Sequence, residues 1–135
     1  MASDMWILRV GCVALAGAVG AVSRWGVTHV VHYSLGESAG RWWFLGTLTV
    51  NALGCFLFGF AIDYFQRYLP QDETLRLAVT AGFLGAFTTF STFAYETVKL
   101  HTSDGLFWAA ANVGLSVVVG LIAVVLGAAT VRSMS

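Results

Sequence analysis

The sequence predicts an all-α membrane protein with four transmembrane helices in a single domain, residues 1–135. Of the 135 residues, 58% are hydrophobic and 10% are charged, whereas soluble domains carry roughly 25% charged residues. The mean hydropathy is +0.78. Four apolar stretches, at about residues 6–31, 43–65, 75–100 and 106–131, compare well with the ~20 residues that a helix needs to cross a bilayer.

The first stretch is the least regular of the four. Fourteen uncharged residues separate Arg9 from Arg24, and a basic start, a short apolar run and the small residues 16–18 also resemble a secretory signal. We favour a true span over residues 6–31, because Arg9 can extend towards the membrane surface.

One face of this first span carries Gly17, Gly20 and Arg24, at positions i, i+3 and i+7. The glycines are typical of a packing seam between membrane helices. A guanidinium near hydrocarbon requires an acidic or carbonyl partner, or an aqueous vestibule in which it attracts anions. Both roles remain open for Arg24.

The second span, residues 43–65, contains Thr47 and Asn51 one helical turn apart, with Gly54 beside them. The amide of Asn51 can donate two hydrogen bonds to an anion without carrying a charge. The alternative is a hydrogen bond to another helix, worth about 1 kcal/mol.

The composition of the third span, residues 75–100, disfavours a continuous helix. Gly82 and Gly85 precede the run Thr88-Thr-Phe-Ser-Thr-Phe93, in which hydroxyl side chains compete for backbone hydrogen bonds. We therefore expect the helix to be broken near its middle, between Gly85 and Thr89. Broken membrane helices occur where the freed backbone groups line a cavity or bind an ion.

Beyond the expected break, Phe90 and Phe93 share one helix face, and Thr89, Thr92 and Glu96 lie on a neighbouring face. The phenylalanines could equally face lipid or the protein core. In the fourth span, residues 106–131, Asn112, Ser116 and Gly120 follow one another at intervals of four. Packing alone could explain that face, but four small or polar faces could also converge on a wet interior.

The charges of the chain indicate neither a binding partner nor one orientation in the membrane. Seven Lys and Arg balance seven Asp and Glu, so there is no basic field to bind nucleic acid. Lys and Arg are divided almost evenly between the two sides of the expected topology, so the chain could insert in both orientations and pair with its inverted copy. Cys12 and Cys55 lie in apolar stretches and are read as small buried residues.

Three segments together resemble the signatures of the Fluc fluoride channel family, also called CrcB. They are Gly17-Ala-Val-Gly-Ala-Val-Ser-Arg24, Gly46-Thr-Leu-Thr-Val-Asn-Ala-Leu-Gly54 and Gly82-Phe-Leu-Gly-Ala-Phe-Thr-Thr-Phe-Ser-Thr-Phe93. The similarity spans all four helices, and the run from Thr88 to Phe93 is its most specific part. Family members often have a Gly-Gly pair where this chain has Ala16-Gly17.

The resemblance implies a fluoride-selective ion channel, not an enzyme, in the inner (plasma) membrane. It implies an antiparallel, dual-topology homodimer with two pores and a structural sodium ion at its centre, held by the backbone carbonyls of Gly85 and Thr88. By position, Asn51, Phe90 and Phe93 match pore residues. The residues on or near the family's polar track are Thr47, Thr92, Glu96 and Ser116, while Arg24 belongs to a vestibule or has a structural role. The role of Asn112 stays open.

The residue types suit this chemistry. A fluoride pore must replace the ion's water with donors that do not trap it, and neutral amides, hydroxyls and the positive edges of aromatic rings meet that need. Two other functions remain: a dual-topology, proton-coupled exporter of hydrophobic cations that uses Glu96, and an assembly subunit without transport activity.

Overall fold

The computed structural model describes residues 2–134, except for the side chains of residues 2–4 and 37–39. Its elements are α1 (Ala2–Leu35), the 3-10 segment η1 (Gly36–Phe44), α2 (Leu45–Tyr68), α3 (Glu73–Leu77), the π-helical η2 (Ala78–Leu84), α4 (Gly85–Phe87), α5 (Phe90–Asp104) and α6 (Leu106–Arg132). Four stretches are long and apolar enough to cross a membrane: Met5–Leu35, Gly40–Tyr68, Glu73–Asp104 and Leu106–Arg132. The predicted all-α class is confirmed, with four helical stretches long and apolar enough to span a membrane; each of them reaches beyond the expected limits at one or both ends.

Short connections join the spans, and local chemistry explains where they turn. Gly40 has φ 43° and ψ −121°, a conformation that a residue with a Cβ rarely adopts. The side chain of Asp72 accepts a hydrogen bond of 2.9 Å from the Leu75 N–H and so caps the start of α3. Gly105, with φ 93°, ends α5 and leads directly into α6.

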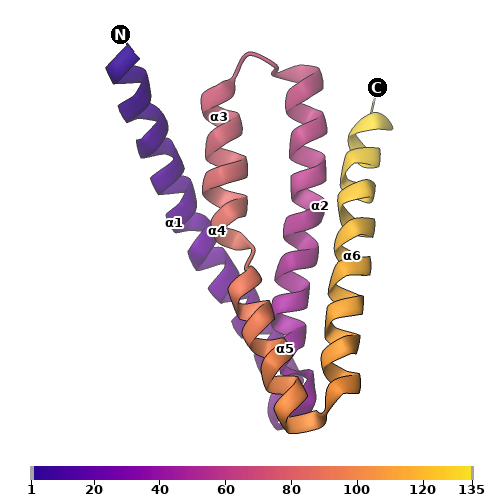
Figure 1. Ribbon diagram of the computed structural model, residues 1–135. Coiled ribbons are helices and arrows are strands. Elements are labelled where there is room, and N and C mark those ends of the chain that lie inside the picture. Colours follow the sequence, from indigo (N-terminus) through magenta and orange to yellow (C-terminus); the bar gives the residue numbers. More distant parts are fainter. Residues whose placement is uncertain (1, 135) are drawn as a thin grey trace.

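The two chain ends and the α2–α3 connection lie at one end of the molecule, and η1 and the α5–α6 turn lie at the other (Figure 1). Helices α2 and α6 run side by side along most of their length. Their backbones approach so closely that a methyl group on Gly59 would overlap the Val124 carbonyl oxygen, and one on Gly127 would overlap that of Phe56. This is the close packing that small residues permit between membrane helices.

Helix α1 packs in a similar way against the first half of the third span. A methyl group on Gly20 would overlap the Phe83 carbonyl oxygen, and one on Gly82 would lie 2.8 Å from the Val13 carbonyl oxygen. The glycine face of the first span is therefore a packing seam against η2.

The third span contains two residues with extended backbone. Thr88 has φ −83° and ψ 160°, and Thr89 has φ −149° and ψ 118°, whereas Gly85 is helical with φ −63° and ψ −34°. Helix α4 thus ends at Phe87 and α5 begins at Phe90, with the chain changing direction between them (Figure 1). The non-helical residues are the threonines at the late end of the expected range, and not the glycine.

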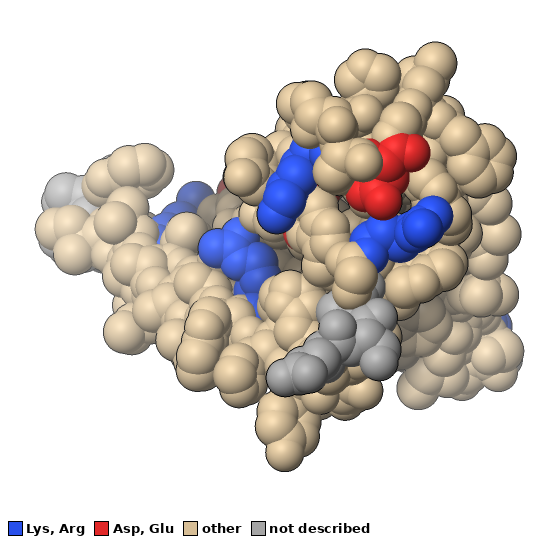
Figure 2. All heavy atoms as spheres, turned by 90° about the horizontal axis from the view of Figure 1, so that it is seen from below, with Lys and Arg blue, Asp and Glu red and all other residues tan. Residues whose placement is uncertain are grey.

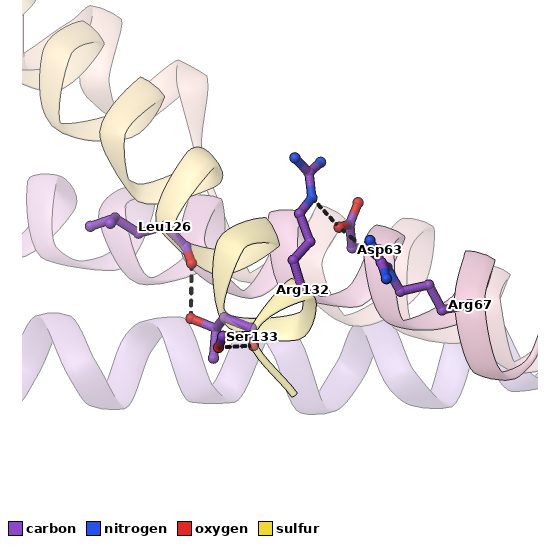
Figure 3. Close-up of polar contacts among 6 residues, drawn as sticks. Asp63, Arg67, Leu126, Arg132 and Ser133 are labelled. Carbon is purple, nitrogen blue, oxygen red and sulfur yellow. Dashed lines mark hydrogen bonds and ion pairs between the residues drawn. The ribbon is translucent and has the colours of Figure 1, made fainter. Parts of the chain in front are cut away.

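Charged side chains at both ends of the molecule are paired. At the end that holds the termini, Arg132 Nε donates a hydrogen bond of 2.8 Å to Asp63 Oδ2, and Arg67 Nε lies 3.9 Å from the same oxygen (Figure 3). At the opposite end, Arg41 Nε lies 3.9 Å from Asp104 Oδ1. Seen from that end, the basic side chains are spread out, and acidic side-chain surface lies beside some of them (Figure 2). In these pairs, basic side chains lie next to carboxylates at both ends of the molecule.

Candidate functional site

The interruption of the third span is held by one side chain of the second span. Asn51 Nδ2 donates a hydrogen bond of 3.0 Å to the Thr89 carbonyl oxygen, and the Thr89 N–H donates one of 2.8 Å to Asn51 Oδ1. This orientation of the amide is the one that satisfies both backbone groups. The deep asparagine therefore bonds to another helix, and one N–H of its amide remains for a further acceptor.

Thr89 also begins the next helix. Its hydroxyl oxygen accepts a hydrogen bond of 3.2 Å from the Thr92 N–H, as an N-cap residue does. The Thr89 hydroxyl in turn donates to Thr92 Oγ1 over 3.0 Å, and the Thr88 hydroxyl donates to the Leu84 carbonyl oxygen over 2.9 Å. Ser91 Oγ lies 3.3 Å from Thr89 Oγ1, so all four hydroxyls of this run take part in hydrogen bonds at the interruption.

A cavity of about 450 Å³ adjoins the interruption. Its lining brings together six of the predicted site residues: Asn51, Gly85, Thr88, Phe90, Phe93 and Ser116. Gly54 and Cys55 of α2 and Thr89 also line it, and none of its lining residues is charged. The cavity is an open, neutral and mainly apolar surface hollow with a few polar groups.

The two phenylalanines lie beside each other at the start of α5. Their ring centroids are 5.7 Å apart with the ring planes inclined by 48°, and Phe90 is 79% exposed. The side chain of Phe90 is therefore largely uncovered in the single chain.

Two further predicted residues form a buried pair away from the cavity lining. The Thr47 hydroxyl donates a hydrogen bond of 2.7 Å to Glu96 Oε1, and each residue is 4% exposed. The second oxygen, Oε2, is buried without a hydrogen-bond partner among the described residues. Thr92, one turn before Glu96 in α5, is also a predicted site residue, but its side chain is exposed.

Arg24 approaches the interruption from α1. Its Nη1 lies 3.4 Å from the Thr88 carbonyl oxygen and donates a long hydrogen bond to it. The arginine thus has the carbonyl partner that its position in an apolar helix requires.

Several polar residues make contacts between helices that the sequence did not predict. Asn112, 2% exposed, donates a hydrogen bond of 2.9 Å to Thr97 Oγ1 and so joins α6 to α5. His32 Nε2 lies 2.8 Å from the Trp43 carbonyl oxygen, to which it donates, and the Lys99 ammonium lies 4.4 Å from the Trp43 ring centroid. Thr89 was part of a polar face in the sequence, but nothing in its spacing identified it as the partner of Asn51.

The comparisons with known proteins identify the family of the chain. The family model described as "CrcB-like protein, Camphor Resistance (CrcB)" matches residues 11–128. The chain belongs to the CrcB family. The matched range includes every predicted site residue. Its family and its four long apolar helices make this CrcB-family chain a multi-pass membrane protein.

Curated relatives carry the name fluoride-specific ion channel FluC. The protein from Dehalococcoides mccartyi is 44% identical over 115 residues, which cover 85% of each chain. That from Geobacter sulfurreducens is 42% identical over 122 residues, covering 90% of this chain and 95% of the relative. That from Geobacter metallireducens is 39% identical over 128 residues, covering 95% of this chain and all of the relative. The names of these relatives describe channels and not enzymes.

Proposed function

We propose that this chain is one protomer of a fluoride-selective channel in the inner (plasma) membrane. Cytoplasmic fluoride leaves through it passively, down its electrochemical gradient, and the cell thereby resists fluoride. The observation that carries the proposal is the neutral cavity at the interruption of the third span, where Asn51 and Ser116 meet Phe90 and Phe93. The names of the relatives support the choice of ion.

The chemistry of the lining supports a conductor of a small anion. Fluoride is strongly hydrated, so a pore must offer donors that replace water without holding the ion. The free N–H of Asn51, the Ser116 hydroxyl and the positive rims of the two phenylalanine rings provide weak, successive stabilisation. The cavity has no lysine or arginine to trap the anion and no carboxylate to repel it.

Homodimerisation would complete the site. Phe90 and Gly85 are exposed in the single chain, and the cavity is open on one side. A second, antiparallel copy related by a two-fold axis would cover this face and form two equivalent pores. The near-even division of Lys and Arg between the two ends of the protomer favours such dual topology, because neither end imposes a strong positive-inside bias.

The end of α4 fits the structural sodium ion of the proposal. A helix leaves its last four carbonyl groups without helical partners. Here these belong to residues 85–88, because the chain is extended at Thr88 and Thr89; the Thr88 carbonyl also accepts the long hydrogen bond from Arg24. Unwound carbonyls at a helix end are typical sodium ligands in membrane proteins. Gly85 and Thr88 from each copy would supply four oxygens, and the ion would offset the charge of the converging carbonyl dipoles.

Purified protein in liposomes tests the proposal. Fluoride efflux that exceeds chloride efflux and persists without a pH gradient is the expected result, and no fluoride efflux under any gradient would refute it. Efflux of a hydrophobic cation driven by protons would instead favour an exporter that uses Glu96. That carboxyl group is bonded to Thr47 and lies outside the cavity lining, which favours the channel.

A further inference from the structure

Asn51 competes with the helix itself for one backbone N–H group. In a continuous helix, the Thr89 N–H would donate to the carbonyl oxygen of Gly85, four residues earlier. In the structure it donates instead to Asn51 Oδ1 over 2.8 Å. The side chain from α2 therefore takes the donor that would otherwise occupy the Gly85 carbonyl.

We infer that Asn51 is a positioning residue that keeps the Gly85 carbonyl available to a cation, in addition to lining the cavity. The inference rests on the proposed sodium site. Thr89 is 9% exposed, and a buried N–H left without an acceptor destabilises the folded protein. Without Asn51, the Thr89 N–H is driven back to the Gly85 carbonyl, and a cation must compete with it for that oxygen.

The other proposed ligand, the Thr88 carbonyl, loses its helical donor in a different way. That donor would be the Thr92 N–H, which donates instead to Thr89 Oγ1 over 3.2 Å, while the Thr88 carbonyl accepts the long 3.4 Å hydrogen bond from Arg24. The hydrogen bond from the Thr92 N–H to Thr89 lies within the third span. The hydrogen bond from the Thr89 N–H to Asn51 instead joins two helices, since the two residues are 38 positions apart in the chain. The amide of Asn51 therefore connects the cavity wall to the proposed cation ligands.

The two halves of the amide can be separated by substitution. Asn51→Ala removes both the acceptor and the donor. Asn51→Asp keeps an oxygen to accept from the Thr89 N–H but loses the NH2 group. A residue that only contacts the permeating anion would affect fluoride flux in both variants and sodium dependence in neither. Phe93→Ile serves as the control for loss of the pore alone, since Phe93 lines the cavity and no hydrogen bond of its side chain is involved.

The measurement is the dimer fraction of the full-length protein in detergent, titrated with sodium chloride at constant ionic strength against choline chloride. We expect the unchanged protein, Asn51→Asp and Phe93→Ile to need similar sodium concentrations for half-maximal dimer, or less for the aspartate. Asn51→Ala should need at least about ten times more, because the Thr89 N–H competes for the ligand oxygen in each of the two copies. Asn51→Ser, whose hydroxyl is too short to bridge, should shift in the same direction and serves if the alanine variant does not fold.

Different failures have different meanings. If Asn51→Ala and Asn51→Ser dimerise at the sodium concentration of the unchanged protein, the inference is wrong while the sodium site stands. An equal shift in Asn51→Asp and Asn51→Ser would also overturn it, because the acceptor oxygen would then be irrelevant. If the unchanged protein dimerises without regard to sodium, the proposed sodium site fails and the inference fails with it.

Discussion

The buried pair of Thr47 and Glu96 offers a test in which the perturbation is one hydroxyl group. Thr47→Val keeps the shape of the side chain but removes the donor that lies 2.7 Å from Glu96 Oε1. Both residues are 4% exposed, and Oε2 already lacks a partner among the described residues. The valine would therefore leave both oxygens of a buried carboxyl group without a protein donor in the described structure.

The structure sets the size of the expected effect. A hydrogen bond to a charged group contributes about 1.5–3 kcal/mol and one between neutral groups about 1 kcal/mol. We expect Thr47→Val to lower the free energy of unfolding by about 2 kcal/mol, since the pair is fully enclosed. Thr47→Ser retains the hydroxyl and should recover most of this loss, apart from the missing methyl group.

Reversible unfolding in mixed detergent micelles measures these free energies. A double-mutant cycle with Glu96→Ala isolates the pair, and we expect a coupling energy of at least about 1 kcal/mol. Equal stabilities for the valine and serine variants, or a coupling energy near zero, would show that the hydrogen bond contributes nothing and would refute the reasoning.

Three other substitutions test separate parts of the structure. Phe93→Ile should abolish or severely slow fluoride efflux from liposomes while the dimer persists, because it removes an aromatic ring from the cavity wall; normal flux would exclude Phe93 from the pore. Gly85→Val should leave the protomer folded, since the nearest atom to an added Cβ is 3.7 Å away. It should nevertheless reduce the fraction of dimer measured by size-exclusion chromatography. A variant that dimerises and conducts normally would contradict the proposed sodium site. Gly127→Ala should cost about 1–3 kcal/mol of unfolding free energy because the methyl group meets the Phe56 carbonyl. Gly114→Ala, on the same helix with nothing within 4 Å, is its control, and equal losses would show that the α2–α6 contact is looser than described.

The behaviour of Asn51 shows how far sequence reasoning reached. An amide within an apolar span required a partner, and both an anion and another helix were expected candidates. The structure gives it a backbone partner at Thr89 and leaves one N–H of the amide without a hydrogen-bond partner among the residues that the structure describes. The proposed role as a pore residue and the inferred role in positioning the break therefore use different atoms of the same side chain.

Arg24 and Asn112 illustrate the same limit. The cost of a guanidinium in hydrocarbon predicted that Arg24 would find a polar partner, but the sequence could not choose between an acid, a carbonyl and water. The structure places the Thr88 carbonyl 3.4 Å away. Asn112, whose role stayed open, is bonded to Thr97 across two consecutive helices.

The sequence by itself determined that the chain lies in a membrane, that it has four helices long enough to span it, and which polar residues need a hydrogen-bonding partner within it. These follow from local properties: the length of apolar stretches, the hydrophobic fraction and the backbone competition of hydroxyl side chains. Only the tertiary structure decided that Asn51 bonds to Thr89, 38 residues later, and that Thr47 bonds to Glu96, 49 residues later. Those pairings depend on how closely the helices approach, which is set by packing between distant segments and has no signature in the spacing of the chain.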